Sequence, residues 1–146
     1  KILNSAKNIF SKDILAHTFM QPAQGIKTGV FGSQRFFNNK PRKPHSGVDY
    51  ANKIGSDILA FGNGEVVLVG DFYFNGKTVL INHGQGFMSI YVHLNEILVS
   101  KGDIVSKGDI IARMGESGRA TGSHLHFGVY LNQIAINPEI FYNSDL

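Results

Sequence analysis

The residues best suited to chemistry in this sequence are its histidines, which stand at positions 17, 45, 83, 93, 124 and 126. The most informative group is His124-Leu125-His126. Side chains in a strand alternate between its faces, so the two imidazoles would share one face, opposite Leu125 and Phe127. Imidazole is the commonest metal ligand in proteins. The pair therefore indicates a metal site more strongly than two ordinary exposed histidines.

A second candidate group is His45 and Asp49, in the segment His-Ser-Gly-Val-Asp. A flat strand would hold their Cα atoms ~13 Å apart. Ligands of one zinc ion, in contrast, have donor atoms only ~3–3.5 Å apart. If both residues bind one metal, the chain must bend between them, and Gly47 would permit such a bend.

His93 lies in an expected strand, where alternation places it with Ser89 and Tyr91 on one face and Val92 on the other. A face carrying Tyr and His fits either a functional surface or an ordinary solvent-facing sheet. His83, at an expected turn, and His17, in a polar amino-terminal segment, belong to no convergent group and are interpreted as structural.

Together these residues supply two histidines and one carboxylate, the three protein ligands that a catalytic zinc needs beside an open fourth position. Two further histidines remain to transfer protons. The same ligand set also serves mononuclear non-haem iron oxygenases. The extra histidines, and the lack of a recognisable co-substrate motif, argue against that alternative.

The elements that must position these residues are predicted to be short strands joined by tight turns, consistent with 17 glycines. Asn75-Gly76 is a hairpin turn signal. Residues 115–122 form a predicted loop that leads into the last strand and would line a site. The motif VSKGDI occurs twice in succession and predicts duplicated turns. The predicted strands are 64–70, 78–82, 87–94 and 125–131.

Length and composition narrow the class of protein. The 146 residues fit one domain, and the absence of cysteine excludes disulfides and thiolate metal sites. No apolar run approaches the length of a membrane span. The net charge of +3 is small, and no basic stripe with interleaved aromatic residues appears, so nucleic-acid binding is the weakest option. Residues 1–18 are predicted to be a linker or short helical arm, and residues 19–146 the functional domain.

Over residues 19–142 the sequence resembles the lysostaphin-type, or LytM-like, zinc metallopeptidases. The HxxxD, xHL and HLH elements in this order are specific as a set. The matching segments are Phe31-Gly32-Ser33-Gln34-Arg35, His45-Ser46-Gly47-Val48-Asp49, Gly64-Glu65-Val66-Val67, Tyr91-Val92-His93-Leu94, Thr121-Gly122-Ser123-His124-Leu125-His126-Phe127 and Asn137-Pro138.

The resemblance implies a compact antiparallel all-β domain with a zinc groove on one sheet. It implies that Zn²⁺ is bound by His45, Asp49 and His126, and that His93 and His124 are the catalytic histidines. Water activated by the zinc would attack the scissile carbonyl while the two histidines transfer protons, either of them serving as the base. Since all five positions match, the alternative of a non-catalytic activator or wall-binding module on the same fold is disfavoured.

The resemblance also suggests a substrate, the peptide cross-links of bacterial peptidoglycan. Residues 36–44 look most like proteobacterial endopeptidases that cut the D,D bond between D-alanine and diaminopimelate. The stem peptides would then be the partner and the periplasm or cell envelope the location, with room for a regulatory partner or a further amino-terminal domain. Arg35 is a candidate for a substrate carboxylate or an ordinary surface arginine, and Lys40, Arg42 and Lys43 are interpreted as a solvated basic loop.

Overall fold

The computed structural model describes residues 15–33, 35–37, 40–42 and 45–142. The described elements are β1 (Ile26–Gly29), β2 (Arg35–Phe37), β3 (Lys40–Arg42), β4 (Val48–Ala51), β5 (Asp57–Leu59), β6 (Gly64–Phe72), β7 (Gly76–Gly84), β8 (Phe87–Ile97), β9 (Ile104–Val105), β10 (Ile110–Met114), β11 (His124–Leu131), β12 (Ile134–Ile136) and the 3₁₀ helix η1 (Pro138–Phe141).

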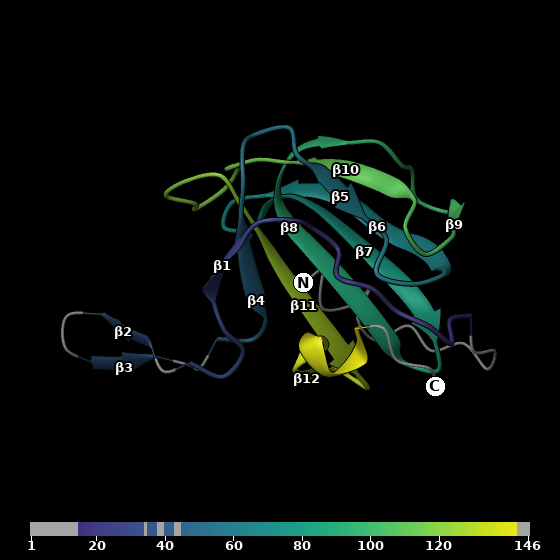
Figure 1. The fold of residues 1–146 in the computed structure, drawn as a ribbon, viewed down its shortest axis with the longest axis horizontal. Helices are drawn as coiled ribbons and strands as arrows, with labels where there is room; N and C mark the ends of the chain where they lie inside the picture. The colour runs from purple at the N-terminus through teal and green to yellow at the C-terminus, as the bar shows by residue number, and fades with distance from the viewer. Residues whose placement is uncertain (1–14, 34, 38–39, 43–44, 143–146) are drawn as a thin grey trace.

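One ten-stranded sheet dominates the fold (Figure 1). Its main path runs β1-β4-β11-β8-β7-β6-β9, with β12 beside β11 and β10 pairing with both β8 and β5. The short strands β2 and β3 form a separate ribbon. Every strand pair is antiparallel. The prediction of an antiparallel all-β domain is therefore confirmed.

The two hairpins predicted from turn residues join β6 to β7 and β7 to β8. Gly76 has a φ of +65°, which glycine adopts without steric cost. In the second turn Gly84, Gln85 and Gly86 all have positive φ. The four predicted strands lie within β6, β7, β8 and β11, each of which extends at least one residue beyond the predicted range.

The duplicated VSKGDI motif forms two equivalent turns, as predicted. In the first, the Asp103 amide donates to Ser100 O, and the Ser100 amide donates to the Asp103 carboxylate. Asp109 and Ser106 make the same pair of bonds in the second. The glycine before each aspartate has a positive φ, as the third position of a type II turn requires.

Apolar side chains cover both faces of the central strands. The larger cluster includes Phe19, Phe61 and Phe127 and lies on one face. A smaller cluster, which includes Leu80 and Ile90, lies on the other. Because both faces are covered, β7 is buried along nearly its whole length. This double packing makes the middle of the sheet a rigid support for side chains at its edge.

A chain of buried hydrogen bonds crosses the larger cluster and includes His83. The Phe61 amide donates to the Tyr91 hydroxyl, and the carbonyl of Asn63 accepts from His83 Nδ1 at 2.7 Å. With Nδ1 protonated, His83 Nε2 must accept from Ser89 Oγ, which in turn accepts from Tyr91. Ser89 and Tyr91 are fully buried, so the alternative of a solvent-facing polar face on β8 is wrong.

His83 should make folding stability depend on pH, because burial lowers its pKa from 6.5 to about 4. The unfolded chain binds a proton first as the pH falls. The contribution of His83 is therefore complete above pH 6.5 and is lost as the pH drops toward 4. The slope is ~1.4 kcal/mol per pH unit for one proton, and so ~3 kcal/mol in total.

The measurement is urea unfolding at a series of pH values, for the native chain and for His83→Gln. Glutamine keeps one donor and one acceptor but does not titrate in this range. The variant is expected to be less stable at pH 7 and to show a shallower fall below pH 6.5. An identical fall in both proteins would contradict the assignment.

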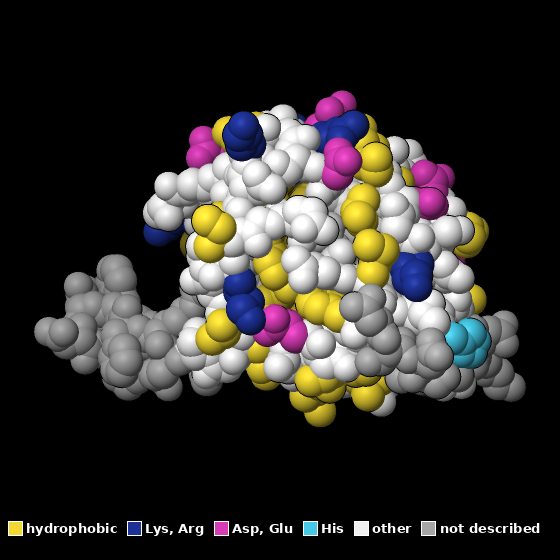
Figure 2. Space-filling view, viewed as in Figure 1, with side chains coloured by type: hydrophobic (Ala, Val, Ile, Leu, Met, Phe, Trp, Pro, Cys, Tyr) yellow, Lys and Arg dark blue, Asp and Glu magenta, His cyan; other side chains and the backbone are white. Residues whose placement is uncertain are grey.

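The described part of the amino-terminal segment packs on the domain. The Leu15 amide donates to His83 O at 2.8 Å, and Ala16 belongs to the larger apolar cluster. Residues 1–14 lie outside the described residues, so the predicted arm and its boundary at residue 18 remain predictions. Among the described residues no helix has the length and apolar character needed to cross a membrane. On the face shown in Figure 2, basic and acidic side chains are interspersed.

Candidate metal centre and groove

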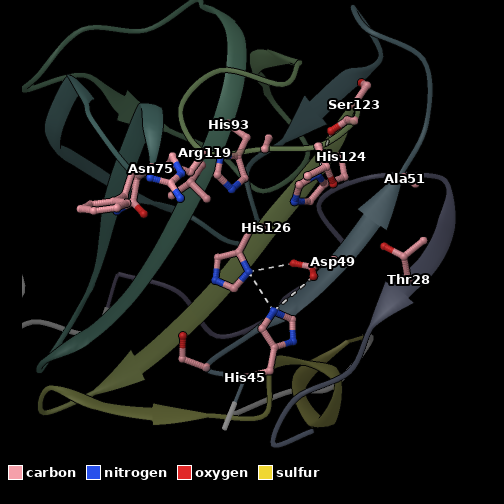
Figure 3. A pocket seen from close by; sticks show the side chains of 16 residues that line it. Thr28, His45, Asp49, Ala51, Asn75, His93, Arg119, Ser123, His124 and His126 are labelled. Carbon is pink, nitrogen blue, oxygen red and sulfur yellow. Dashed lines mark hydrogen bonds and ion pairs between the residues drawn. The ribbon is translucent and has the colours of Figure 1, made fainter. Parts of the chain in front are cut away.

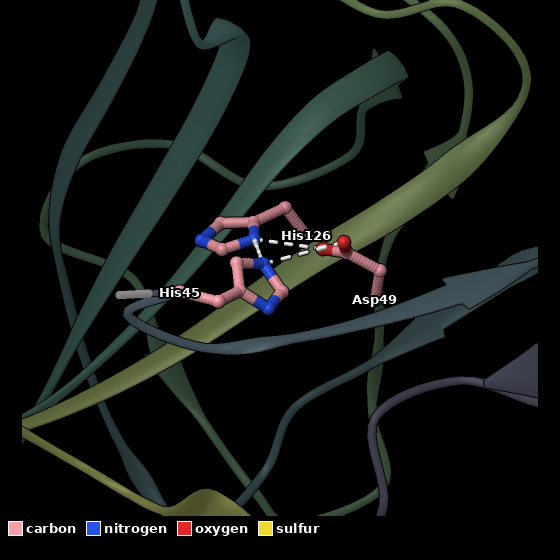
Figure 4. A group of neighbouring side chains, drawn as sticks. All are labelled: His45, Asp49 and His126. Atoms are coloured by element: carbon pink, nitrogen blue, oxygen red, sulfur yellow. Dashed lines mark hydrogen bonds and ion pairs between the residues drawn. The ribbon is translucent and has the colours of Figure 1, made fainter. Parts of the chain in front are cut away.

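Three of the predicted site residues converge because β4 pairs with β11. The register places Asp49 directly opposite His126. His45 precedes β4. The chain bends at Gly47, and the His45 ring lies beside Asp49 and His126 (Figure 4). A Cβ on Gly47 would lie 2.2 Å from Phe127 O. The predicted bend at Gly47 is present, and the close approach of β11 also requires glycine at this position.

The donor atoms of the three residues form a compact triangle. His45 Nε2 lies 3.2 Å from Asp49 Oδ2 and 3.1 Å from His126 Nδ1, and His126 Nδ1 lies 2.8 Å from Asp49 Oδ1. Donor atoms around a tetrahedral zinc ion with bonds of ~2.0–2.1 Å are separated by ~3.3 Å. The observed separations fit such an ion.

The protonation of His45 also suits a cation. Its Nδ1 lies 2.9 Å from Val30 O, and a carbonyl only accepts, so Nδ1 carries the proton and Nε2 presents a lone pair. That lone pair faces Asp49 and His126, both of which can present further lone pairs. His45 and Asp49 are buried, at 5% and 8% exposure. A buried cluster of acceptors of this kind is stabilised by a metal ion.

Asp49 is held in its charged form. Burial alone would raise the pKa of this carboxyl. The hydrogen bond from His126, together with the positive charges of His126, His45 and His124 when protonated, outweighs burial and lowers the pKa below its usual value. The ionised carboxylate is the form that a metal ion binds.

His93 reaches the same groove through a bulge in β8. Its φ is +65°, in the left-handed region that non-glycine residues rarely occupy. The pairing of β7 with β8 shifts register between Lys77 and Val79, opposite this point. As a result Val92 and His93, which are neighbours in sequence, both line the groove, while Leu94 returns to the core. Strict alternation would have directed His93 with Tyr91 into the core.

The two remaining histidines stand side by side, with ring centroids 4.8 Å apart. His93 Nδ1 donates to Ser117 O at 2.8 Å, and His124 Nδ1 donates to Gly122 O at 2.9 Å. Each ring therefore keeps Nε2 as an acceptor. Burial lowers the pKa of His93 despite the Ser117 bond, and His124 and His126 lower it further when they are protonated. His93 is neutral near pH 7, as a general base must be.

Ser117 positions His93, a role that sequence reasoning missed. Its carbonyl accepts from His93, while its hydroxyl donates to Leu94 O at 2.6 Å and accepts from the Lys77 amide at 3.0 Å. These bonds attach the loop 115–122 to β7 and β8. The predicted loop was the only sequence signal for this region, and it did not single out Ser117.

The five predicted site residues line one groove of about 770 Å³ (Figure 3). Thr28 and Ala51 lie on one side of it, and Asn75 and Arg119 lie on the other. Residues 119–122 of the predicted loop and the following Ser123 also line the groove. Of the predicted basic residues, Arg35 is in β2 and Lys40 and Arg42 are in β3, with side chains outside the described part. Lys43 lies outside it altogether.

Comparison with known sequences identifies the family. The profile of Peptidase family M23 matches residues 43–138, so the chain belongs to that family. It is 42% identical over 86 residues to the peptidoglycan DD-endopeptidase ShyB of Vibrio cholerae, a match covering 59% of this chain and 20% of ShyB. It is 40% identical over 94 residues to ShyA of the same organism, covering 64% of this chain and 22% of ShyA. The match thus spans about a fifth of these relatives.

Solved structures agree. A putative peptidase M23 from Pseudomonas aeruginosa superposes with a TM-score of 0.82 at 37% identity, over 99% of this chain and 59% of that one. A zinc-containing peptidase from Vibrio cholerae superposes with a TM-score of 0.76 at 32% identity, over 87% of this chain and 40% of that one. The catalytic domain of lysostaphin from Staphylococcus simulans superposes with a TM-score of 0.70 at 29% identity, over 80% of this chain and 91% of that one. The predicted family resemblance and fold are confirmed.

Proposed function

We propose that this chain is a zinc metalloendopeptidase that hydrolyses peptide cross-links of bacterial peptidoglycan, at the D,D bond. One observation carries the proposal. A triad suited to a metal ion, His45, Asp49 and His126, shares a groove with two histidines whose Nε2 atoms are free to accept protons. The zinc-containing relative of similar fold supports the choice of metal.

Zinc bound at the triad would polarise a scissile carbonyl and acidify a water molecule. The protein side chains would then transfer the protons. One of His93 and His124 accepts a proton from the attacking water at Nε2, and a protonated imidazole returns one to the leaving amine. Their Nδ1 bonds to backbone carbonyls fix both the tautomer and the ring orientation. Among the described residues lining the groove, Asp49 has the only carboxylate, so no second acid competes for this role.

The ionisable side chains that line the groove also argue for amide rather than glycosidic cleavage. Sugar hydrolysis normally uses two carboxylates that flank the bond. Asp49 is committed to the triad, and the described lining contains no second carboxylate. The names of the relatives ShyB and ShyA support a peptidoglycan D,D bond as the target. Such a substrate implies action in the cell envelope, and a regulatory partner remains an expectation.

Digestion of purified sacculi tests this function. Cross-linked muropeptide dimers are expected to convert to monomers, with new free amines and no new reducing sugar ends, as measured by mass analysis of the fragments. Enzyme treated with a chelator is the control. New reducing ends without amines would contradict the peptidase assignment, whereas cleavage of pentaglycine alone would change the substrate and keep the chemistry.

The alternative of a non-catalytic activator or wall-binding module predicts a different outcome, in which the purified chain binds sacculi but releases no fragments. The complete set of five site residues favours the enzyme.

A further inference from the structure

Phe74 and Arg119 line one wall of the groove, and with the neighbouring Tyr73 they form an exposed cluster. The two rings make an edge-to-face pair with centroids 4.8 Å apart, and they are 74% and 64% exposed. The Arg119 guanidinium carbon lies 6.0 Å from the Tyr73 ring centroid and 5.6 Å from that of Phe74. Exposed aromatic side chains beside an arginine are typical of binding surfaces.

We propose that Arg119 binds a free carboxylate of the substrate, located on the residue that supplies the amine of the scissile bond. The inference rests on the proposed peptidase function. It makes Arg119 a specificity-determining residue, and the aromatic pair the support that holds its guanidinium at the edge of the groove.

The charge of Arg119 is available for a ligand. Within the described part of the chain, no carboxylate forms an ion pair with Arg119, whereas Lys27 pairs with Glu139 and Arg113 with Asp57. Arg119 is also the only lysine or arginine among the described residues that line the groove. A guanidinium that stacks on aromatic rings keeps its N–H edge free to bind a carboxylate in bidentate fashion.

The position of Arg119 is fixed relative to the catalytic candidates. Its amide donates to Phe74 O at 2.9 Å, and the next residue along, Asn75, accepts from the His93 amide at 2.8 Å. Ser117, two residues before Arg119, holds the His93 ring. A Cβ on Gly76 would lie 2.4 Å from Ser117, so this contact between the two loops is close. Arg119 and His93 therefore belong to one wall of the groove (Figure 3).

The chemistry of a D,D bond supplies the carboxylate. On its carbonyl side stands D-alanine, whose side chain is only a methyl group. On its amine side stands the D-centre of a diamino acid, which keeps its own α-carboxylate next to the scissile nitrogen. Of the two residues that the scissile bond joins, only the one on the amine side therefore carries an anionic group. A single cation on one wall of the groove matches that asymmetry.

The test compares two synthetic cross-linked peptides that differ only at this carboxylate, one free and one amidated. The native enzyme should cleave the free acid with a kcat/KM about tenfold or more above that for the amide, the usual range for a charge-assisted hydrogen bond. Arg119→Gln should lose that preference, because its kcat/KM should fall for the free-acid peptide and change little for the amidated peptide. Arg119→Lys should retain part of it.

Arg113→Gln is the matched control, because Arg113 lies in β10, is paired with Asp57 and does not line the groove. It should keep the native preference. Zinc content should be unchanged in all variants. Equal losses on both peptides in Arg119→Gln, or no preference in the native enzyme, would overturn the inference and leave the peptidase function standing. Failure of the native enzyme to cleave either peptide would overturn the function itself.

Discussion

His126→Ala is expected to lose zinc and hydrolytic activity together. His126 Nδ1 lies within 3.1 Å of both other donor residues, so its removal leaves His45 and Asp49 as an incomplete site. Loss of a mere outer-sphere partner of a metal ligand typically costs ~10–100-fold in affinity or activity, and loss of a direct ligand should cost more. Zinc content by elemental analysis, measured beside the rate of muropeptide release, checks the prediction.

Two further variants sharpen this experiment. Asp49→Asn nearly preserves the shape of the side chain but removes the charge that its lowered pKa maintains, and it should also lose zinc. His17→Ala removes an exposed histidine remote from the groove lining and should change neither quantity. Full zinc occupancy in His126→Ala would show that the triad is wrongly assigned.

Substitution of His93 or His124 should have the opposite signature, with zinc retained and turnover lost. A general acid or base is typically worth about 10²–10⁴-fold in rate. For His93 the better replacement is asparagine, because asparagine tolerates the left-handed φ of +65° at the bulge more readily than alanine does. His124→Ala is suitable in β11. Single-turnover kinetics on a defined cross-linked peptide would separate the chemical step from binding.

The double variant is informative as well. If the two histidines act in sequence on one proton path, the combined loss should be much smaller than the product of the single losses. Near-normal rates in both single variants, with zinc in place, would show that water or another residue transfers the protons.

The sequence by itself determined four of the strands and the turns between them, and it named the five candidate residues that line one groove. Alternation along β11 correctly separated Leu125 and Phe127, which are buried in the core, from His124 and His126, which line the groove. Paired VSKGDI motifs specified paired turns. Periodicity and turn chemistry act over a few residues, so they can be seen in the chain without knowledge of its partners.

The side chains of β8 show where such local reasoning ends. Alternation grouped His93 with Ser89 and Tyr91, but only the latter two are fully buried. The bulge at His93 changes the direction of the following side chains, and it arises from the pairing of β8 with β7. Register between strands depends on long-range packing, which no short window of sequence contains.

Only the tertiary structure decided which loops support the groove. Phe74 and Arg119 are 45 positions apart in the chain and meet because Ser117 bonds to Lys77 and Leu94. His83, expected at a turn, proved to be a fully buried member of a hydrogen-bonded chain. These contacts exist only after the sheet has formed. The sheet brings together residues that are far apart in the chain, and the sequence around each of them does not identify its partner.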